Sequence, residues 1–167
     1  MSSSLSVESS SSVSGTQNGG VLASHFGTSL TRKALYELLE QVSRTFALSN
    51  RMLPRRFRYP MTVAYLLFRV SDYLEDNPVL RRWEKAELLH SWERVLAGVM
   101  PTGELEGALR PLPRSDSEAE VAHRFGQILE KLEEMPPEVG EPIRQHAREP
   151  TLARQICHTQ GPTTRTD

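Results

Sequence analysis

The sequence is poor in cysteine and contains no long apolar run. A single thiol, Cys157, cannot form an internal disulfide, and the other thiols of a typical structural zinc site are absent. No stretch reaches about 18 consecutive apolar residues, so the sequence predicts no membrane-spanning helix. The N-terminus also lacks the basic start and apolar centre of a secretory signal. We therefore expect a cytoplasmic protein whose membrane contact, if it has one, is peripheral.

An excess of positive charge is also missing. The chain has 20 Lys and Arg residues against 21 Asp and Glu, which gives a formal net charge of -1. Proteins that bind nucleic acids normally present a basic face, so this balance argues against a nucleic acid partner. Arginine outnumbers lysine 17 to 3, and the densest group is Arg55, Arg56 and Arg58. Guanidinium groups suit phosphates, although a solvated loop with surface ion pairs is the simpler interpretation of any one of them.

Several common catalytic motifs are absent as well. The five histidines are far apart and form no H-E-x-x-H pair, which argues against a histidine metal site. Gly19 and Gly20 form a linker rather than a phosphate-binding loop, because no strand precedes them and no helix begins there. The sequence therefore contains no dinucleotide-binding fingerprint.

The composition divides the chain into three regions. Residues 1–28 hold nine serines within the first fourteen positions and show no apolar period, which predicts a disordered Ser-rich tail. Residues 29–149 carry apolar residues at helical spacing. Residues 150–167 collect Thr, Pro and Gly without any period, and we expect an aperiodic tail there.

The middle region predicts an all-α fold. Apolar residues recur at three- and four-residue spacing, and no alternating strand pattern of useful length occurs. The segment 61–76 is apolar around most of its circumference, as expected of a helix that is buried on most sides. We therefore predict a bundle of about five helices, with a looser linker between the third and the fourth. Their expected ranges are 29–50, 61–76, 82–99, 117–135 and a segment that begins at 136.

The end of the second predicted helix carries three acidic residues in "FRVSDYLEDNP", residues 68–78. Asp72, Glu75 and Asp76 are spaced i, i+3, i+4, so they share one helix face, where like charges repel. They also occupy the last turn, where the helix dipole disfavours anions. A divalent cation such as Mg²⁺ removes both penalties, and Mg²⁺ is typically held by one or two carboxylates together with substrate phosphates. A solvated helix end is the alternative interpretation.

The same helix face continues toward the N-terminus with an arginine and then aromatic residues. Arg69, Phe68 and Tyr65 precede Asp72 at helical spacing. This order suits a cavity that binds an anionic head group at one end and a hydrocarbon chain at the other. Ordinary core packing is the alternative for Phe68 and Tyr65.

One segment, residues 42–78, resembles the start of the squalene/phytoene synthase family. Its sequence is "VSRTFALSNRMLPRRFRYPMTVAYLLFRVSDYLEDNP". These head-to-head trans-prenyltransferases carry an S-[RK]-[ST]-F segment and "AYLLCRIADTIED"-like text at about this separation. The resemblance continues more weakly to about residue 149, and it is closer to bacterial squalene synthases than to phytoene synthases. It implies the N-terminal part of an isoprenoid synthase-type helical bundle.

The resemblance implies roles for individual residues. Asp72, Glu75 and Asp76 match the first aspartate-rich motif, which binds the Mg²⁺ that bridges to a prenyl diphosphate. Arg69 matches a diphosphate-contacting arginine, and Tyr65 matches a tyrosine that lines the chain pocket. By this match Asp72, Asp76 and Tyr65 are the catalytic candidates. The residues that match the first-helix segment in contact with the diphosphate and the start of the pocket are Ser43, Arg44, Thr45 and Phe46.

The chemistry implied by the resemblance is the coupling of two prenyl diphosphates, most simply farnesyl diphosphate. Mg²⁺ and arginine neutralise the charge that develops on the leaving diphosphate as the allylic substrate ionises. Squalene-type members then reduce a cyclopropyl intermediate with NADPH, a cofactor that rests here on resemblance alone.

The chain departs from the family pattern in its second half. Members carry a second aspartate-rich motif on a later helix, and nothing after residue 100 supplies it; Asp116 stands alone in a linker. We therefore expect a truncated or frameshifted chain, or one with an alternative end, that is inactive as a synthase by itself. Two alternatives stay open, a phytoene synthase-type enzyme and a non-catalytic helical fragment that only binds prenyl diphosphate.

Overall fold

The computed structural model describes residues 29–148, so the tails predicted for 1–28 and 150–167 lie outside the described residues. The described part contains eight α-helices and no strand, which confirms the all-α prediction. No helix in this part is long and apolar enough to cross a membrane. The helices are α1 (Arg32–Val42), α2 (Arg44–Met52), α3 (Arg55–Asp76), α4 (Arg82–Leu96), α5 (Thr102–Leu109), α6 (Ser117–His123), α7 (Phe125–Glu133) and α8 (Pro137–Arg148).

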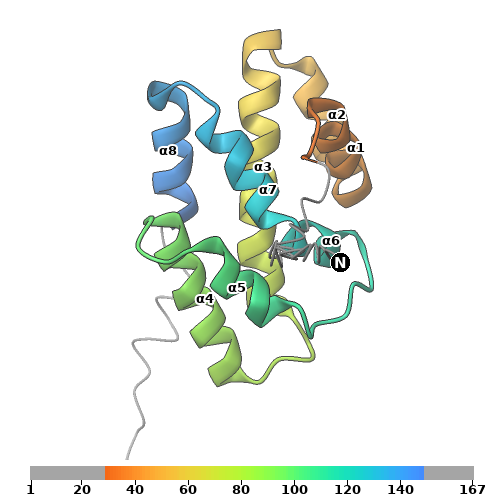
Figure 1. The fold of residues 1–167 in the computed structure, drawn as a ribbon. Coiled ribbons are helices and arrows are strands. Elements are labelled where there is room, and N and C mark those ends of the chain that lie inside the picture. Colours follow the sequence, from red (N-terminus) through yellow and green to blue (C-terminus); the bar gives the residue numbers. More distant parts are fainter. Residues whose placement is uncertain (1–28, 149–167) are drawn as a thin grey trace, which may run out of the picture.

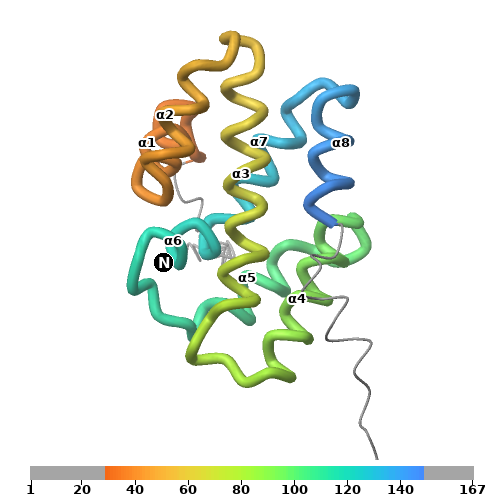
Figure 2. Tube along the Cα trace, turned by 180° about the vertical axis from the view of Figure 1, so that it is seen from behind, coloured from red at the N-terminus to blue at the C-terminus, as the bar shows by residue number. Residues whose placement is uncertain are grey.

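Helix α3 is the centre of the bundle (Figures 1 and 2). It has 22 residues, and it packs against every other described helix except α5. Helices α1 and α2 lie beside its N-terminal half, and α4 and α5 lie toward its C-terminal end. Nine of the thirteen positions from Thr62 to Leu74 are buried. The continuous apolar character of its sequence is therefore explained by neighbours on most of its sides.

The first predicted helix, 29–50, is divided at Ser43. The backbone of Ser43 is extended, with φ -152° and ψ 98°. Its N–H donates to the carbonyl oxygen of Leu39 over 2.8 Å and ends α1, while its Oγ accepts the N–H of Phe46 over 3.2 Å and begins α2. One serine thus caps two helices. The apolar period continues across this break, which is why it predicted a single helix.

Other boundaries differ for local reasons. Helix α3 begins six residues before the predicted position and includes Pro60. Beside that proline, Asn50 of α2 donates to the carbonyl oxygen of Arg58 over 3.0 Å and to the Thr62 hydroxyl over 2.9 Å. The fourth predicted helix is divided at Arg124 into α6 and α7, and the predicted linker contains α5. These changes account for eight helices in place of about five.

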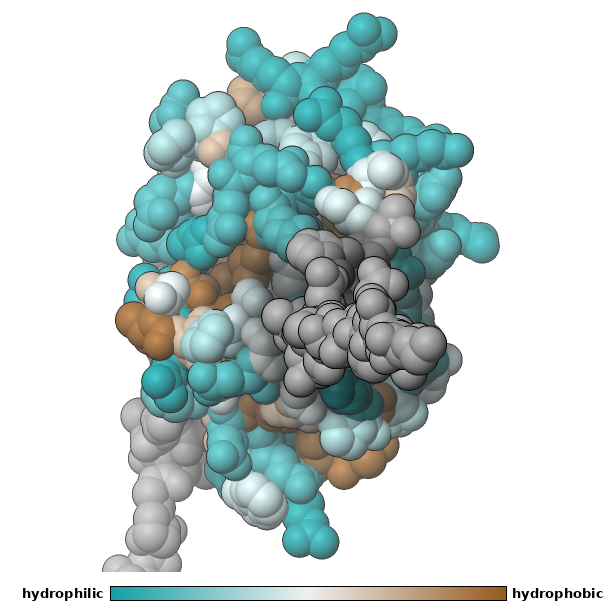
Figure 3. All heavy atoms as spheres, in the orientation of Figure 1, coloured by the Kyte–Doolittle hydropathy of each residue, from teal (hydrophilic) through white to brown (hydrophobic). Residues whose placement is uncertain are grey.

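The core is built where α3, α4 and α7 meet. Trp92 of α4 is fully buried, and its indole N–H donates to the Ser71 hydroxyl of α3 over 3.0 Å. Phe125 of α7 is also fully buried and packs edge-on against Trp92, with ring centroids 5.5 Å apart. The face of the molecule in Figure 3 is largely hydrophilic, with separate apolar patches. The large aromatic side chains therefore hold the helices together from inside.

Phe125→Ala tests this arrangement. The variant removes a fully buried ring and the edge contact with Trp92, so we expect the free energy of unfolding to fall by about 3–5 kcal/mol. Urea unfolding followed by circular dichroism measures the change. Phe57→Ala is the matched control, because Phe57 is 45% exposed and its loss is expected to cost less than about 0.5 kcal/mol. Equal losses in the two variants would contradict the core assignment.

Candidate functional site

The predicted acid and arginine residues meet at the C-terminal half of α3. The Arg69 guanidinium donates to Asp72 Oδ2 over 2.8 Å, one turn further along the same helix. It also forms an ion pair with Glu118, in the first turn of α6. The side chain of Arg69 is only 22% exposed, and its Nε is buried without a partner among the described residues. Two carboxylates from different helices thus hold this arginine in place.

The pKa shifts at this end of α3 follow from burial and from neighbouring charges. Burial raises the pKa of the Asp72 carboxyl, and the nearby charges of Glu75 and Asp76 raise it further, while Arg69 lowers it. Burial lowers the pKa of the Arg69 guanidinium, but Glu118 and Asp72 outweigh burial and the net shift is upward. The repulsion predicted between the three acids is therefore present at Asp72, where it adds to the larger effect of burial and opposes the attraction of Arg69.

The chemistry of these carboxylates fits a divalent cation in part. Three carboxylates lie within about one turn, and a cation would relieve the repulsion that, after burial, raises the pKa of Asp72. Within residues 29–148, however, no group of three acidic, histidine or cysteine side chains is arranged so that it could hold a metal ion by itself. An ion here would need further ligands, and phosphate oxygens and water are the usual ones for Mg²⁺.

The end of α3 is stabilised by polar groups from its surroundings. Lys85 of α4 donates from its ammonium group to the main-chain carbonyl oxygen of Glu75 over 2.8 Å. The N–H of Asn77 closes the last turn on the carbonyl oxygen of Tyr73 over 3.1 Å. Lys85 thus supplies positive charge at the negative end of the helix dipole and compensates in part for the acids there.

The two predicted sequence motifs are joined by an aromatic stack. The Phe46 ring of α2 lies on the Tyr65 ring of α3, with centroids 4.0 Å apart and an interplanar angle of 17°. Tyr65 is one turn before Arg69 on α3, so the stack lies next to the ion pairs. Residues 19 positions apart in the sequence are therefore brought onto one part of the surface.

The other predicted residues lie at different places. Ser43 is the cap between α1 and α2, and Thr45 is an exposed residue of α2 whose carbonyl oxygen accepts from the Ser49 hydroxyl. Arg44 lines a hollow of about 670 Å³ along α1 and α2. Phe68 is partly exposed. The structure therefore places Phe46 on Tyr65, one turn before Arg69, whereas Arg44 and Thr45 make no hydrogen bond or ion pair with Arg69, Asp72 or Glu118.

Glu118 is the site residue that the sequence analysis missed. It follows Asp116, whose carboxylate accepts the N–H of Ala119 over 2.8 Å and caps α6. Acidic residues are common in the first turn of a helix, so Glu118 looked like an ordinary part of that pattern. It is 49 residues from Arg69, and no local spacing predicts that contact.

Comparisons with known proteins support the resemblance noted in the sequence. The family described as squalene/phytoene synthase matches residues 39–159. "Squalene synthase BSS" of Botryococcus braunii is 37% identical over 57 residues, which are 34% of this chain and 12% of that protein. "Squalene synthase LSS" of the same organism is 37% identical over 59 residues, 35% of this chain and 13% of its own length. The alignments thus span about an eighth of these relatives. No solved structure matches the chain significantly.

The raised pKa of Asp72 predicts a pH dependence of stability. Because the folded-state pKa lies above the ordinary aspartate value of 3.8, the proton on Asp72 stabilises the fold below pH 3.8, and this contribution is lost as the pH rises through the folded pKa. The amide of Asp72→Asn does not ionise, so the variant keeps its stability as the pH rises while the unmodified chain loses the contribution of the Asp72 proton. We therefore expect the free energy of unfolding of the variant, minus that of the unmodified chain, to increase with pH across this window.

Urea unfolding of both proteins at a series of pH values from about 3 to 7 measures this difference. Glu87→Gln, on the exposed surface of α4, is the control for a general loss of one negative charge. A relative stability that decreases with rising pH would mean that the Arg69 ion pair outweighs burial at Asp72.

Proposed function

Because the chain belongs to the squalene/phytoene synthase family, we propose that α2 and α3 bind the diphosphate group of a prenyl diphosphate. The observation that carries this proposal is the order of groups along one face of α3. Acids occupy the last turn, Arg69 lies before them, and the stack of Tyr65 on Phe46 follows one turn further back. A prenyl diphosphate has the same order, with an anionic head followed by an apolar chain.

Each group has a defined task in the proposed complex. Arg69 donates hydrogen bonds to diphosphate oxygens from its guanidinium group. Glu118 and Asp72 hold the guanidinium in position. The aromatic faces of Tyr65 and Phe46 receive the first part of the prenyl chain, where a ring face also stabilises nearby positive charge.

Asp72, Glu75 and Asp76 are the residues that would hold Mg²⁺. When bound, Mg²⁺ supplies positive charge that stabilises the departing diphosphate. The part of the reaction that this chain's own residues perform is binding and orientation. Arg69 fixes the head group, and the aromatic stack directs the chain away from the acids, so the allylic carbon lies between the two.

The proposed reaction of the whole protein is the coupling of two farnesyl diphosphates. The relatives named as squalene synthases favour this type over a phytoene synthase. From the resemblance of residues 42–78 we also propose the bacterial squalene synthase type and the use of NADPH as reductant.

A binding function without turnover is the second candidate. It is favoured by the sequence of residues 101–167, which contains no second aspartate-rich motif to match the one on α3. In either candidate Glu118 occupies Arg69 donors that a diphosphate would also use, so its carboxylate competes with the ligand unless it moves.

Isothermal titration with farnesyl thiodiphosphate, an analogue that resists ionisation, tests the proposed site. We expect binding that depends on Mg²⁺ and that weakens about tenfold or more in Asp72→Asn/Asp76→Asn, because charge-assisted contacts are lost. Glu87→Gln/Glu138→Gln is the matched control, with the same change in charge at exposed positions of α4 and α8. The proposal is wrong if the analogue does not bind, or binds equally to both double variants.

Glu118→Gln tests the role of Glu118 at this site. If Glu118 competes with the ligand, the neutral amide should raise the affinity for the thiodiphosphate about tenfold, since one charge-assisted contact of Arg69 is released. The same titration measures this change, and a thermal melt verifies that the variant is folded. A weaker affinity would instead indicate that Glu118 positions Arg69 for the ligand.

A further inference from the structure

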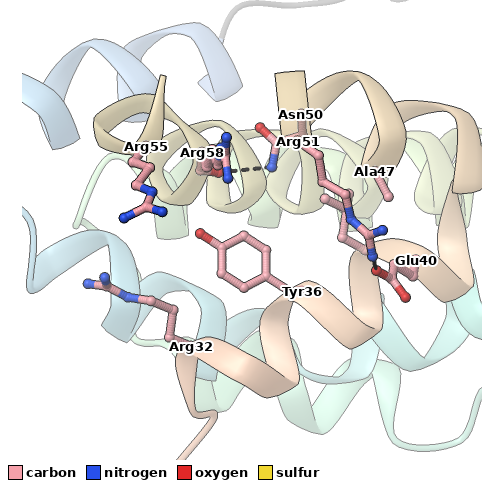
Figure 4. Close-up of a pocket in the computed structure, with 9 residues that line it drawn as sticks. Arg32, Tyr36, Glu40, Ala47, Asn50, Arg51, Arg55 and Arg58 are labelled. Atoms are coloured by element: carbon pink, nitrogen blue, oxygen red, sulfur yellow. Dashed lines mark hydrogen bonds and ion pairs between the residues drawn. The ribbon is translucent and has the colours of Figure 1, made fainter. Parts of the chain in front are cut away.

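A second group of arginines lines a cavity at the other end of α3 (Figure 4). The cavity has a volume of about 460 Å³ and lies between α1, the end of α2 and the start of α3. Four of its lining residues are arginines, and the only acidic one is Glu40. The arginines are Arg32, Arg51, Arg55 and Arg58.

This cavity is separate from the acidic end of α3. Arg55 is the first residue of α3, and 17 positions separate it from Asp72. At a rise of about 1.5 Å per residue, the two lie roughly 25 Å apart along the helix axis. No residue predicted from the sequence to contact the diphosphate or a metal lines the cavity.

Three of the four guanidiniums have no acidic partner among the described residues. Arg51 forms an ion pair with Glu40. Arg58 is held by a hydrogen bond from its Nε to the carbonyl oxygen of Leu53, over 2.8 Å. Arg32 lies over the Tyr59 ring, 4.2 Å from its centroid, and Arg55 makes no hydrogen bond or ion pair with the described part of the chain. The terminal N–H groups of Arg32, Arg55 and Arg58 thus remain available to a ligand.

Other groups around the cavity also favour an anion. Figure 4 shows the Tyr36 hydroxyl pointing toward the space between Arg32, Arg55 and Arg58. The N-terminus of α3 has no acidic residue in its first turn, and no side chain caps its free N–H groups. The positive end of the helix dipole therefore adds to the charge of the arginines.

One buried acceptor is also without a partner. Asn50 lines the cavity and is 3% exposed, and its Nδ2 is used by Arg58 and Thr62. Its Oδ1 is buried and has no donor in the described part of the chain. Buried polar groups normally have partners, so this oxygen is an unusual feature of the cavity wall.

The balance of charge at the cavity requires explanation. Four guanidiniums and one carboxylate give a local charge of about +3 in a chain whose formal net charge is -1. Like charges gathered around one cavity repel, and a bound anion turns this repulsion into attraction. Arginine matches the oxygen geometry of phosphate, and the volume is in the range of small-molecule sites.

We propose that this cavity binds a phosphate-bearing anion, a phosphate monoester or diphosphate, at a site separate from the acidic end of α3. Two sources present the same chemistry, a small soluble molecule and the head group of an anionic lipid. The lipid source has a structural basis, because Met52 and Phe57, which are 88% and 45% exposed, follow or flank lining arginines in the sequence.

Titration of inorganic diphosphate into the 167-residue chain, in EDTA so that no Mg²⁺ contributes, tests the site. Arg55→Gln should weaken binding about tenfold, because it removes one charge-assisted contact from a residue with no other partner. Arg56→Gln is the matched control, since Arg56 is in the same turn but lies over Phe57 and does not line the cavity. Arg32→Gln provides a second lining variant, on a different helix.

The outcomes distinguish this site from the one proposed above. Binding that is weakened by Arg55→Gln and Arg32→Gln, but not by Arg56→Gln or Asp72→Asn/Asp76→Asn, upholds the cavity. Absence of binding overturns the proposal, as does an equal loss in Arg55→Gln and Arg56→Gln. Failure of thiodiphosphate binding alone would leave this result unchanged, because the two experiments use different residues.

Vesicles identify the source of the anion. A lipid head group is identified if the chain is retained on phosphatidylglycerol vesicles but not on phosphatidylcholine vesicles. This retention should be lost in Arg55→Gln and should be reduced by competing inorganic diphosphate. Diphosphate binding without vesicle retention identifies a soluble ligand, and both results uphold the cavity. The proposal is overturned if the chain does not bind diphosphate and is retained on vesicles to the same extent with Arg55→Gln or with added diphosphate.

Discussion

The burial of α3 is the constraint on which the rest of the structure depends. Six helices pack around it, and nine of its side chains between Thr62 and Leu74 are buried in the centre of the bundle. A helix enclosed in this way can present polar groups to solvent only along a narrow face and at its two ends. The acids gather at the C-terminal end and arginines at the N-terminal end. The charged side chains of α3 are therefore concentrated at the two ends of the helix, where neighbouring helices leave them in contact with solvent.

Charge balance at Arg69 shows how a partly buried group stays ionised. Removal from water disfavours the guanidinium cation, and this effect is the largest one acting on it. Glu118 and Asp72 more than compensate, so the cation is favoured in the fold. The Asp72 carboxylate is less favoured than it would be in water, because its pKa is raised by burial and by its acidic neighbours. A cation near the acids would relieve their mutual repulsion, and an anion near Arg69 would accept hydrogen bonds from its guanidinium group.

The parts that the sequence predicted correctly depend on residues close together in the chain. The acidic face of α3 follows from spacing alone, and the family was recognised from motifs within residues 42–78. The break at Ser43 was missed because the apolar period continues through it. The contact of Arg69 with Glu118 joins residues 49 apart, and the cavity requires Arg32 and Arg51 to approach the start of α3. Such contacts arise from how the helices pack, which local periodicity does not contain.

Helix α2 contributes residues to both of the proposed sites on α3, one from each of its ends. Its first turn is fixed by the Ser43 cap, which places Phe46 on Tyr65 beside the acidic end. Its last turn places Asn50 and Arg51 at the start of α3, and Asn50 holds that turn by donating to Arg58. A change in the direction of α2 would therefore displace the aromatic stack and the arginine cavity together. Because both sites share this short support, the orientation set at Ser43 determines the geometry of each of them.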